Sequence, residues 1–130
     1  MSTTSLAVAC AWIEAANLQD IDRLLELSSD DIEIIGPRGS ARGPDILRDW
    51  LARAGLRLVN ARAFQRGGAV VIEHHGVWRS MEAGAVIGEA DVSSRFEVQG
   101  GRVMAYERFD SLEAALASAG LDRRDETTNG

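Results

Sequence analysis

The chain has 130 residues, 45% hydrophobic and 26% charged, a composition typical of one ordinary globular domain. Its net charge of −6 argues against a nucleic-acid partner, because proteins that bind phosphate backbones gather Lys and Arg into a positive surface. No apolar run approaches the roughly 18 residues that span a membrane. The single Cys10 excludes an intrachain disulfide, and the first residues lack the basic start of a signal peptide. We therefore expect a cytoplasmic protein that binds neither nucleic acid nor membrane.

The first half of the chain predicts three helices and one strand. Apolar residues at helical spacing from Leu6 to about Asn17 predict a mostly buried helix. Asp20 is placed to cap a second, short helix, which the polar cluster Ser28–Asp31 should end. A first strand follows at Ile32–Ile35. Gly43-Pro44 then opens a third helix, since Pro is tolerated at the first helical position.

In the second half of the chain the spacing of apolar residues changes from helical to a period of about two. Gly55 is placed to end the third helix as a left-handed cap, and antiparallel strands follow. Their expected ranges are Arg57–Phe64, Ala69–Arg79, Ala85–Val98 and Arg102–Phe109. Asp110 and Glu113 have the spacing of a capping box at the start of a last helix, which runs to Ala119. Because helices and strands do not alternate, the fold class is α+β, with one domain over 1–121 and a flexible polar tail over 122–130.

Side-chain alternation predicts which residues of the strands face the helices. One inward set contains Val70, Ile72, His74, Gly76 and Trp78, and the next strand adds Ala90, Val92, Ser94 and Phe96. On the last strand the more apolar side holds Val103, Ala105, Glu107 and Phe109. His74 and Glu107 would then point into one apolar space. Tyr106 would lie on the opposite side, which argues against a catalytic phenol.

Two segments carry a family resemblance: Glu73-His74-His75-Gly76-Val77-Trp78-Arg79 and Tyr106-Glu107-Arg108-Phe109-Asp110-Ser111-Leu112-Glu113. With the order of elements, they make the chain similar to the nuclear-transport-factor-2-like (NTF2-like) superfamily, nearest to SnoaL-like polyketide cyclases and limonene epoxide hydrolases. The likeness runs from Leu6 to Leu121. It implies a cystatin-like cone, in which N-terminal helices pack on a strongly curved, mainly antiparallel sheet and enclose an apolar pocket. Enzymes and binding proteins share this fold, so it does not decide the reaction.

Most functional positions of these families are altered in this chain. The ketosteroid isomerase pattern has its proton-shuttling Asp before a Pro, where this chain has Gly36, and its Tyr on the first helix corresponds to Trp12. The Asp of that pattern's oxyanion hole falls near Val92. The epoxide hydrolase pattern of Arg, Asp and a second Asp reads His74, Gly76 and Glu107 here. The resemblance therefore leaves one acid and one imidazole.

We interpret His74 as a candidate general base and Glu107 as the acid that orients it, because imidazole titrates near neutral pH. The same pair also suits a structural hydrogen bond, since a buried acid needs a partner. The expected pocket residues are Trp12, Trp50, Trp78, Val92, Ser94 and Phe96. No metal or cofactor is expected, because His74 and His75 point to opposite faces of a strand.

Two functions remain open. The first is a small enzyme that uses general acid–base catalysis, as a hydrolase, isomerase or cyclase, on a small apolar organic molecule. The second is a domain of the same fold that binds a small molecule or dimerises without chemistry. In either case the mixed outer face of the sheet predicts a homodimer, as the resemblance implies.

Overall fold

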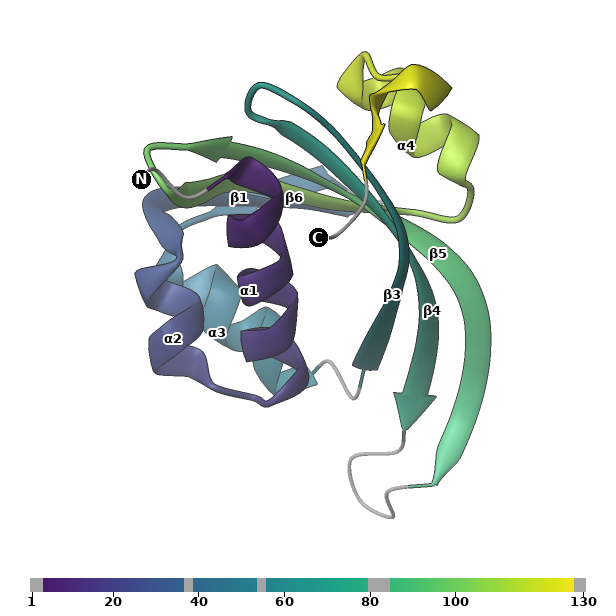
Figure 1. The fold of residues 1–130 in the computed structure, drawn as a ribbon. Helices are drawn as coiled ribbons and strands as arrows, with labels where there is room; N and C mark the ends of the chain where they lie inside the picture. The colour runs from purple at the N-terminus through teal and green to yellow at the C-terminus, as the bar shows by residue number, and fades with distance from the viewer. Residues whose placement is uncertain (1–3, 37–38, 54–55, 80–84, 128–130) are drawn as a thin grey trace.

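A computed structural model describes residues 4–36, 39–53, 56–79 and 85–127. Figure 1 shows the N-terminal helices packed on one side of a strongly curved sheet, with the last helix apart from them on the other side. The elements in chain order are α1 (Ser5–Asn17), α2 (Ile21–Glu26), β1 (Ser28–Gly36), β2 (Gly39–Arg42), α3 (Pro44–Arg53), β3 (Leu56–Arg66), β4 (Ala69–Arg79), β5 (Val86–Gln99), β6 (Arg102–Phe109), α4 (Leu112–Ala119), the 3₁₀ helix η1 (Arg123–Asp125) and β7 (Glu126–Thr127).

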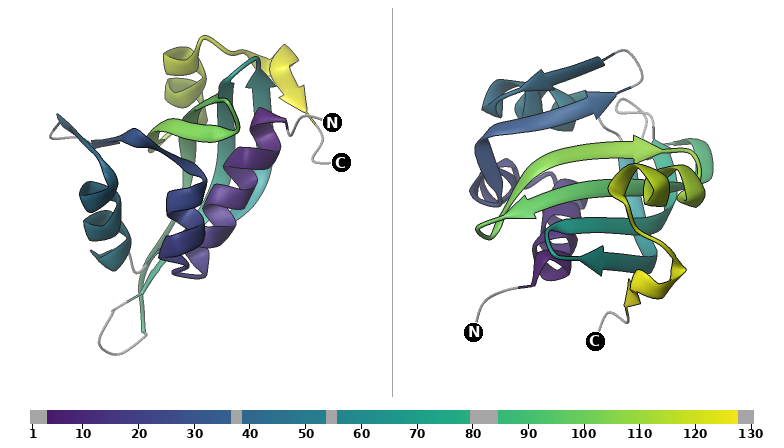
Figure 2. Two further views of the ribbon diagram at one scale, coloured as in Figure 1. Left: turned by 90° about the vertical axis from the view of Figure 1, so that its left-hand side faces the viewer. Right: turned by 90° about the horizontal axis from the view of Figure 1, so that it is seen from above.

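Within the described residues the strands form one seven-stranded sheet in the order β2-β1-β6-β5-β4-β3-β7. Neighbouring strands are antiparallel except β1 and β6, which pair in parallel. Figure 2 shows how strands β3 to β6 bend around the N-terminal helices. The predicted α+β cone is confirmed, with N-terminal helices on a mainly antiparallel, curved sheet.

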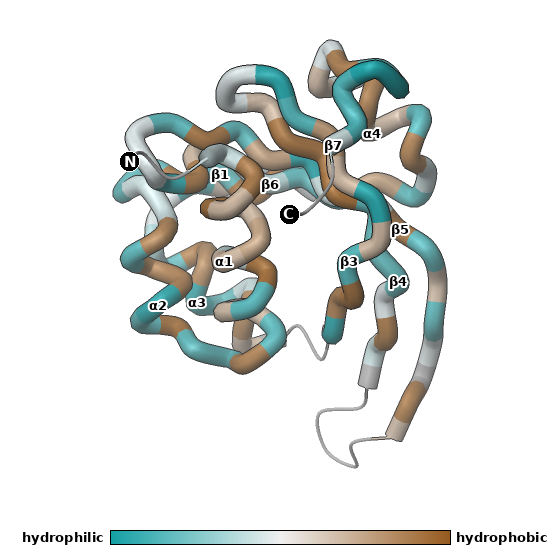
Figure 3. Tube along the Cα trace, viewed as in Figure 1, coloured by the Kyte–Doolittle hydropathy of each residue, from teal (hydrophilic) through white to brown (hydrophobic). Residues whose placement is uncertain are grey.

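The concave face of the sheet carries the larger core. Helices α1, α2 and α3 cover this face, and its buried residues include Trp12, Val70, Ile72 and Phe96. A smaller cluster lies on the convex face, where Leu112, Ala115 and Leu116 of α4 pack on Phe64 and Val71. Strand β4 is therefore apolar on both faces near its start, because Val70 and Ile72 belong to the larger core and Val71 to the smaller one; Figure 3 colours the chain by hydropathy. No helix in the described ranges combines the length and apolar character that a bilayer crossing needs.

Most of the predicted helix boundaries are confirmed. Asp20 caps α2 by accepting from the backbone N–H of Arg23, and Gly120 ends α4 with a φ of 72°. The predicted N-cap of α4 is wrong by one residue, because the hydroxyl of Ser111, and not the carboxylate of Asp110, accepts from the Ala114 N–H. The proposed cap at Gly55 lies outside the described residues.

The first strand begins earlier than its composition predicts. Ser28–Asp31 belongs to β1, although we expected it to end α2 as a polar turn. Pairing with β6 explains the difference: Ser28 is opposite Val103, and Val103 N–H donates to Leu27 C=O at 2.7 Å. The neighbouring strand β2 was not predicted, because it is short and polar. Residues 37 and 38, between β1 and β2, lie outside the described residues.

Part of the segment predicted as a flexible tail has a defined conformation in this structure. Asp122 and Asp125 form a capping box around η1. The Arg66 guanidinium donates two hydrogen bonds, from Nε and Nη2, to the two carboxylate oxygens of Asp125. Strand β7 then adds to the edge of the sheet beside β3. Charge pairs hold this segment, which explains why an apolar pattern did not predict it.

Candidate functional site

His74 lies in the concave core and is 1% exposed. Its Nδ1 is 2.8 Å from Oδ1 of Asn60, and its Nε2 is 2.9 Å from Oγ of Ser94. Burial lowers the pKa of His74 to about 4, although the charge of Glu73 acts in the opposite direction. The imidazole is therefore neutral at pH 7, and both of its nitrogens have a partner.

The contacts of His74 belong to a longer row of polar side chains. The Ser94 hydroxyl is also hydrogen-bonded to the Tyr106 hydroxyl, with 3.2 Å between the oxygens. Asn60, His74, Ser94 and Tyr106 come from the consecutive strands β3, β4, β5 and β6. We call these four residues the polar ladder. Burial raises the pKa of Tyr106 despite its hydrogen bond to Ser94, so the phenol keeps its proton at neutral pH.

Two β-bulges place the ends of the ladder on the inner face. Asn60 is opposite His74, but Ala63 is opposite Ile72, so β3 contains one extra residue between them. Strand β6 likewise gains a residue at Met104, between the pairs formed by Ala105 and Val103. Simple alternation from Val103 would turn Tyr106 outward, and the bulge turns it inward. Sequence reasoning therefore missed Asn60 and misplaced Tyr106, because alternation cannot reveal a bulge.

The same bulge removes the predicted pair of His74 and Glu107. Glu107 is opposite Arg95 on β5, and its carboxylate accepts from the Arg95 guanidinium at 3.3 Å. His74 instead bonds Asn60 and Ser94. The expectation that Glu107 orients His74 is thus wrong, and an amide takes that place. Whether either residue is catalytic stays a prediction.

Four aromatic rings fill the core beside the ladder. Trp12 is fully buried and stacks on Tyr106 with 4.8 Å between ring centroids, and Trp50 and Phe96 lie at 5.4 and 5.6 Å from it. The Trp12 indole N–H donates to Ser28 Oγ at 2.9 Å. Of the predicted pocket residues, Trp12 and Phe96 therefore pack as core side chains. Val92 is also buried in this core.

A pocket of about 480 Å³ opens between α3 and the ends of β1 and β6. Trp50 and Tyr106 contribute its aromatic wall, and Ile34 adds an aliphatic side chain. Its residues are Ile34, Ile35, Gly36, Trp50, Tyr106, Glu107, Arg108, Phe109 and Asp110. The polar ladder thus ends at a residue of the pocket wall.

Arg108 gives this pocket a positive group. Its guanidinium lies 5.3 Å from the ring centroid of Trp78, within the range of a cation–π contact. None of the described carboxylates forms an ion pair with it. The pocket therefore combines an apolar wall with the cation Arg108 and the carboxylates of Glu107 and Asp110, of which Glu107 is paired with Arg95.

Gly36 and Gly76, which stand where the patterns of related families have an Asp, differ in their surroundings. A Cβ added to Gly76 would lie 3.1 Å from the Trp78 ring and 3.4 Å from Leu58, so these side chains occupy the place of a carboxylate. Gly36 has room beside it and lines the 480 Å³ pocket. A water-activating acid at position 76 is incompatible with the observed place of Trp78.

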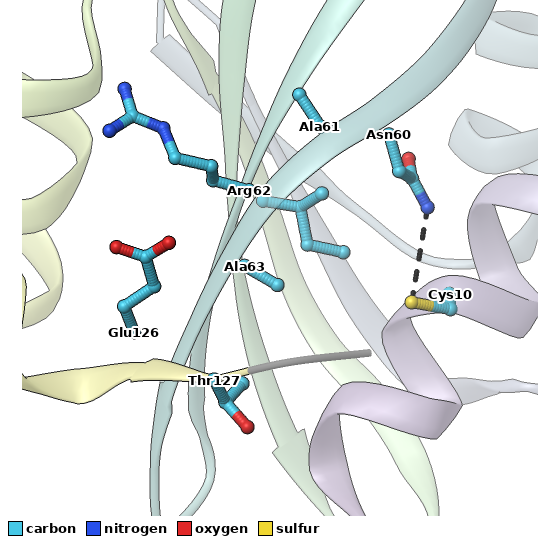
Figure 4. Close-up of a pocket in the computed structure, with 8 residues that line it drawn as sticks. Cys10, Asn60, Ala61, Arg62, Ala63, Glu126 and Thr127 are labelled. Atoms are coloured by element: carbon cyan, nitrogen blue, oxygen red, sulfur yellow. Dashed lines mark hydrogen bonds between the residues drawn. The ribbon is translucent and has the colours of Figure 1, made fainter. Parts of the chain in front are cut away.

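A second, smaller pocket of about 250 Å³ lies at the other end of the ladder (Figure 4). Asn60 points toward Cys10 of α1, with Nδ2 3.9 Å from Sγ, while Arg62 and Glu126 lie on the other side of β3. Burial raises the pKa of the Cys10 thiol, which favours the unreactive protonated form. The ladder therefore connects two pockets on opposite sides of the concave core.

The second histidine belongs to the convex face. His75 is exposed, and its nitrogens lie 3.1 Å from a carboxylate oxygen of Asp91 and 3.3 Å from one of Glu89. These hydrogen bonds raise the pKa of His75. Asp91 thus pairs on the outside, away from the ladder. No cluster of three or more His, Cys, Asp or Glu suited to a metal ion occurs within the part of the chain that the structure describes.

Comparison with known proteins finds a family for most of the chain. Residues 9–106 match the SnoaL-like domain family. No curated protein matches the chain. The fold is similar to that of an uncharacterised cystatin-fold protein from Novosphingobium aromaticivorans, with 23% identity, a TM-score of 0.72, and coverage of 83% of this chain and 99% of that one.

Two further solved structures have names that bear on function. TerC, crystallised with polyporic acid, is 18% identical with a TM-score of 0.71 and coverage of 88% of this chain and 96% of that one. A protein from Xanthomonas campestris, provisionally named a polyketide cyclase, is 20% identical with a TM-score of 0.68 and the same coverage. At these identities the likeness establishes the fold alone. By its family match and its fold, this chain belongs to the SnoaL-like domain family of NTF2-like proteins.

Proposed function

We propose that this protein binds a small organic molecule with an apolar body and a polar oxygen in the 480 Å³ pocket and catalyses a proton transfer on it. The observation that carries the proposal is the polar ladder, which links Tyr106 of the pocket wall to the buried, neutral imidazole of His74. Buried polar groups are costly unless satisfied, so three of them in a row within an aromatic core favour a functional role.

The ladder can take up and return one proton. A C–H bond beside a substrate carbonyl breaks as its proton moves to the Tyr106 oxygen; the phenol hydrogen moves to Ser94, and the Ser94 hydrogen moves to Nε2 of His74. The products are an enolate and an imidazolium. Because the pKa of His74 is about 4, this imidazolium readily returns its proton by the reverse route. Such a cycle suits an isomerase or cyclase, in which the proton goes back to the substrate.

The pocket also suits the charge that this step creates. Arg108 is near enough to lower the pKa of Tyr106 by its charge, and it would stabilise a developing enolate oxygen. The flat indole of Trp50 would hold the apolar body of the ligand. Polyporic acid, with which the structural neighbour TerC was crystallised, is therefore a reasonable first probe for binding.

The test uses 2-tetralone, an apolar aromatic ketone with acidic hydrogens beside its carbonyl. We expect the wild-type protein in D₂O to accelerate the replacement of these hydrogens by deuterium, followed by proton NMR. Tyr106→Phe removes only the hydroxyl and should lower the rate by at least about 10²-fold, the lower range for general acid–base catalysis. Quenching of tryptophan fluorescence by 2-tetralone serves as the control that this variant still binds the ketone.

Equal exchange rates for wild type and Tyr106→Phe, with binding retained, would contradict the catalytic role. The alternative is then a small-molecule-binding domain without chemistry. One observation favours that alternative: both nitrogens of His74 are already bonded within the protein. Binding of 2-tetralone or polyporic acid without any exchange would support it.

We further propose that two copies pair through the convex face of the sheet. Val59 on this face is 54% exposed and lies beside His75, with Val77 on the same face nearer the end of β4. Burying these side chains against a second copy would remove apolar surface from water. Sedimentation of the purified chain should then give twice the 14.0 kDa of one copy, and Val59→Asp should shift the mass toward one copy. A wild-type chain that sediments as a single copy would overturn this proposal.

A further inference from the structure

The hydrogen bonds of His74 restrict where its proton lies. A neutral imidazole carries one N–H, and the Oδ1 of Asn60 that faces Nδ1 can only accept. Nδ1 must therefore donate to Asn60, and Nε2 must accept the hydrogen of the Ser94 hydroxyl. Because the single hydrogen of the Ser94 hydroxyl is then used at Nε2, the 3.2 Å contact between the Ser94 and Tyr106 oxygens requires Tyr106 to donate in this arrangement. In this arrangement the Tyr106 oxygen has only an acceptor left for a partner outside the ladder.

A half-turn of the Asn60 amide reverses the entire ladder. The Nδ2 of Asn60 would then donate to Nδ1, and Nε2 would carry the hydrogen and donate to Ser94. The Ser94 hydroxyl would donate to Tyr106, which leaves the phenol hydrogen free for the pocket. Both arrangements satisfy every member of the ladder with a neutral imidazole. A mixed arrangement leaves one pair of facing acceptors or facing donors.

Asn60 stands where such a turn is feasible. Asn60 is exposed, whereas His74 and Ser94 are buried, and it lines the smaller pocket beside Cys10. The Cys10 sulfur is both a weak acceptor and, as a thiol, a weak donor, so it accommodates either face of the amide. The observed orientation, with Nδ2 toward Sγ, corresponds to the arrangement in which Nδ1 carries the hydrogen (Figure 4).

We propose that Asn60 is a positioning residue: the orientation of its amide sets which nitrogen of His74 carries the hydrogen, and thereby whether Tyr106 accepts or donates at the pocket. The consequence at the pocket rests on the proposed function, but the state of His74 does not. A ligand carbonyl would favour the arrangement in which Tyr106 donates. A ligand hydroxyl would favour the one in which Tyr106 accepts.

The first arm of the test is ¹⁵N NMR of the imidazole nitrogens at pH 7 without ligand. The chain has two histidines, so in His75→Gln the only histidine signals come from His74. In this background we expect a protonated Nδ1 and an unprotonated Nε2. Asn60→Leu keeps the size of the side chain but removes both polar atoms, and it should convert the signals to the opposite form or to a mixture. Unchanged nitrogen signals in Asn60→Leu would overturn the proposal.

Asn60→Asp supplies a matched variant in which the side chain can only accept. We expect Nδ1 to stay protonated, and the midpoint for the second proton on His74 to rise by about 1–3 pH units, as for a carboxylate within reach of an imidazole. The surrounding charges are otherwise unchanged, because Glu73, the carboxylate that acts on His74, is paired with Arg62. A midpoint equal to that of the Asn60 protein would contradict a direct contact between residue 60 and His74.

The second arm adds 2-tetralone, whose carbonyl only accepts. In the His75→Gln protein we expect the hydrogen to move from Nδ1 to Nε2 on saturation, and in Asn60→Asp we expect no such shift. Exchange of the bound ketone then requires the Asn60 amide to turn back, because the relay through Tyr106 and Ser94 runs only when Nε2 can accept. If the ligand-free variants behave as expected and the ketone binds without moving the hydrogen, the proposed link between His74 and the Tyr106 hydroxyl is wrong. The effect of Asn60 on the hydrogen of His74 then still stands. If the ketone does not bind, the proposed pocket function fails instead.

Discussion

The free energy of unfolding should fall by about 3 kcal/mol between pH 7 and pH 4 because of His74 alone. The pKa of His74 is about 4 in the folded chain, compared with 6.5 for the free side chain. Each unit of difference corresponds to about 1.4 kcal/mol. Since the folded pKa is the lower one, the unfolded chain binds more protons between these values, and stability is lost as pH falls through this window.

The adjacent histidine provides a control with the opposite sign. His75 is exposed, and its carboxylate partners raise its pKa above 6.5. Its contribution to stability is therefore present at low pH and is lost as pH rises through the raised pKa. Two neighbouring residues of the same type thus act in opposite directions, because one lies in the core and the other on the convex surface.

Urea unfolding between pH 4 and pH 7 measures both effects. His74→Gln should flatten the pH dependence of the unfolding free energy, while His75→Gln should make the loss on acidification slightly larger. The comparison concerns the slope against pH, because His74→Gln also changes hydrogen bonds in the core. Wild-type slopes that persist in His74→Gln would contradict a buried, neutral His74.

Residues of β4 and β5 were placed correctly from the sequence. Alternation turned Ile72, His74, Ser94 and Phe96 toward the helices, and all four are buried there. These strands pair without a shift of register over their central residues, from Ala69 to Trp78 on β4. A period of two is reliable where nothing interrupts it.

The pairing partners of those residues could not be predicted. Asn60 and Tyr106 reach the inner face only because β3 and β6 each contain an extra residue. A bulge is set by the pairing of two strands, and neither strand alone carries its signal. For the same reason the sequence placed Glu107 inside, where the structure has Tyr106.

The content of the pocket also depends on packing that a sequence does not encode locally. All three tryptophans were candidates for its wall, yet Trp12 is enclosed by other rings and Trp50 lines the opening. Trp78 lies over Gly76, whose missing side chain makes room for the ring. Which aromatic residue faces a ligand follows from the placement of α3, an element far from the strands in sequence.

Ser94 is the link on which the whole account depends. Ser94→Ala deletes the one oxygen that joins Tyr106 to His74, and it leaves two buried polar groups without their shared partner. Each such group costs about 1–3 kcal/mol of stability. Ser93→Ala is the matched control, because it removes the same hydroxyl from an equally buried neighbour on the other face of β5.

The most direct measurement is therefore the rate of deuterium exchange into 2-tetralone by wild type, Ser94→Ala and Ser93→Ala at a temperature where all three are folded. The account predicts that Ser93→Ala keeps the wild-type rate, while Ser94→Ala loses at least about 10²-fold, as Tyr106→Phe does. Exchange by Ser94→Ala at the wild-type rate would show that proton transfer does not pass through the ladder, and would contradict the central claim.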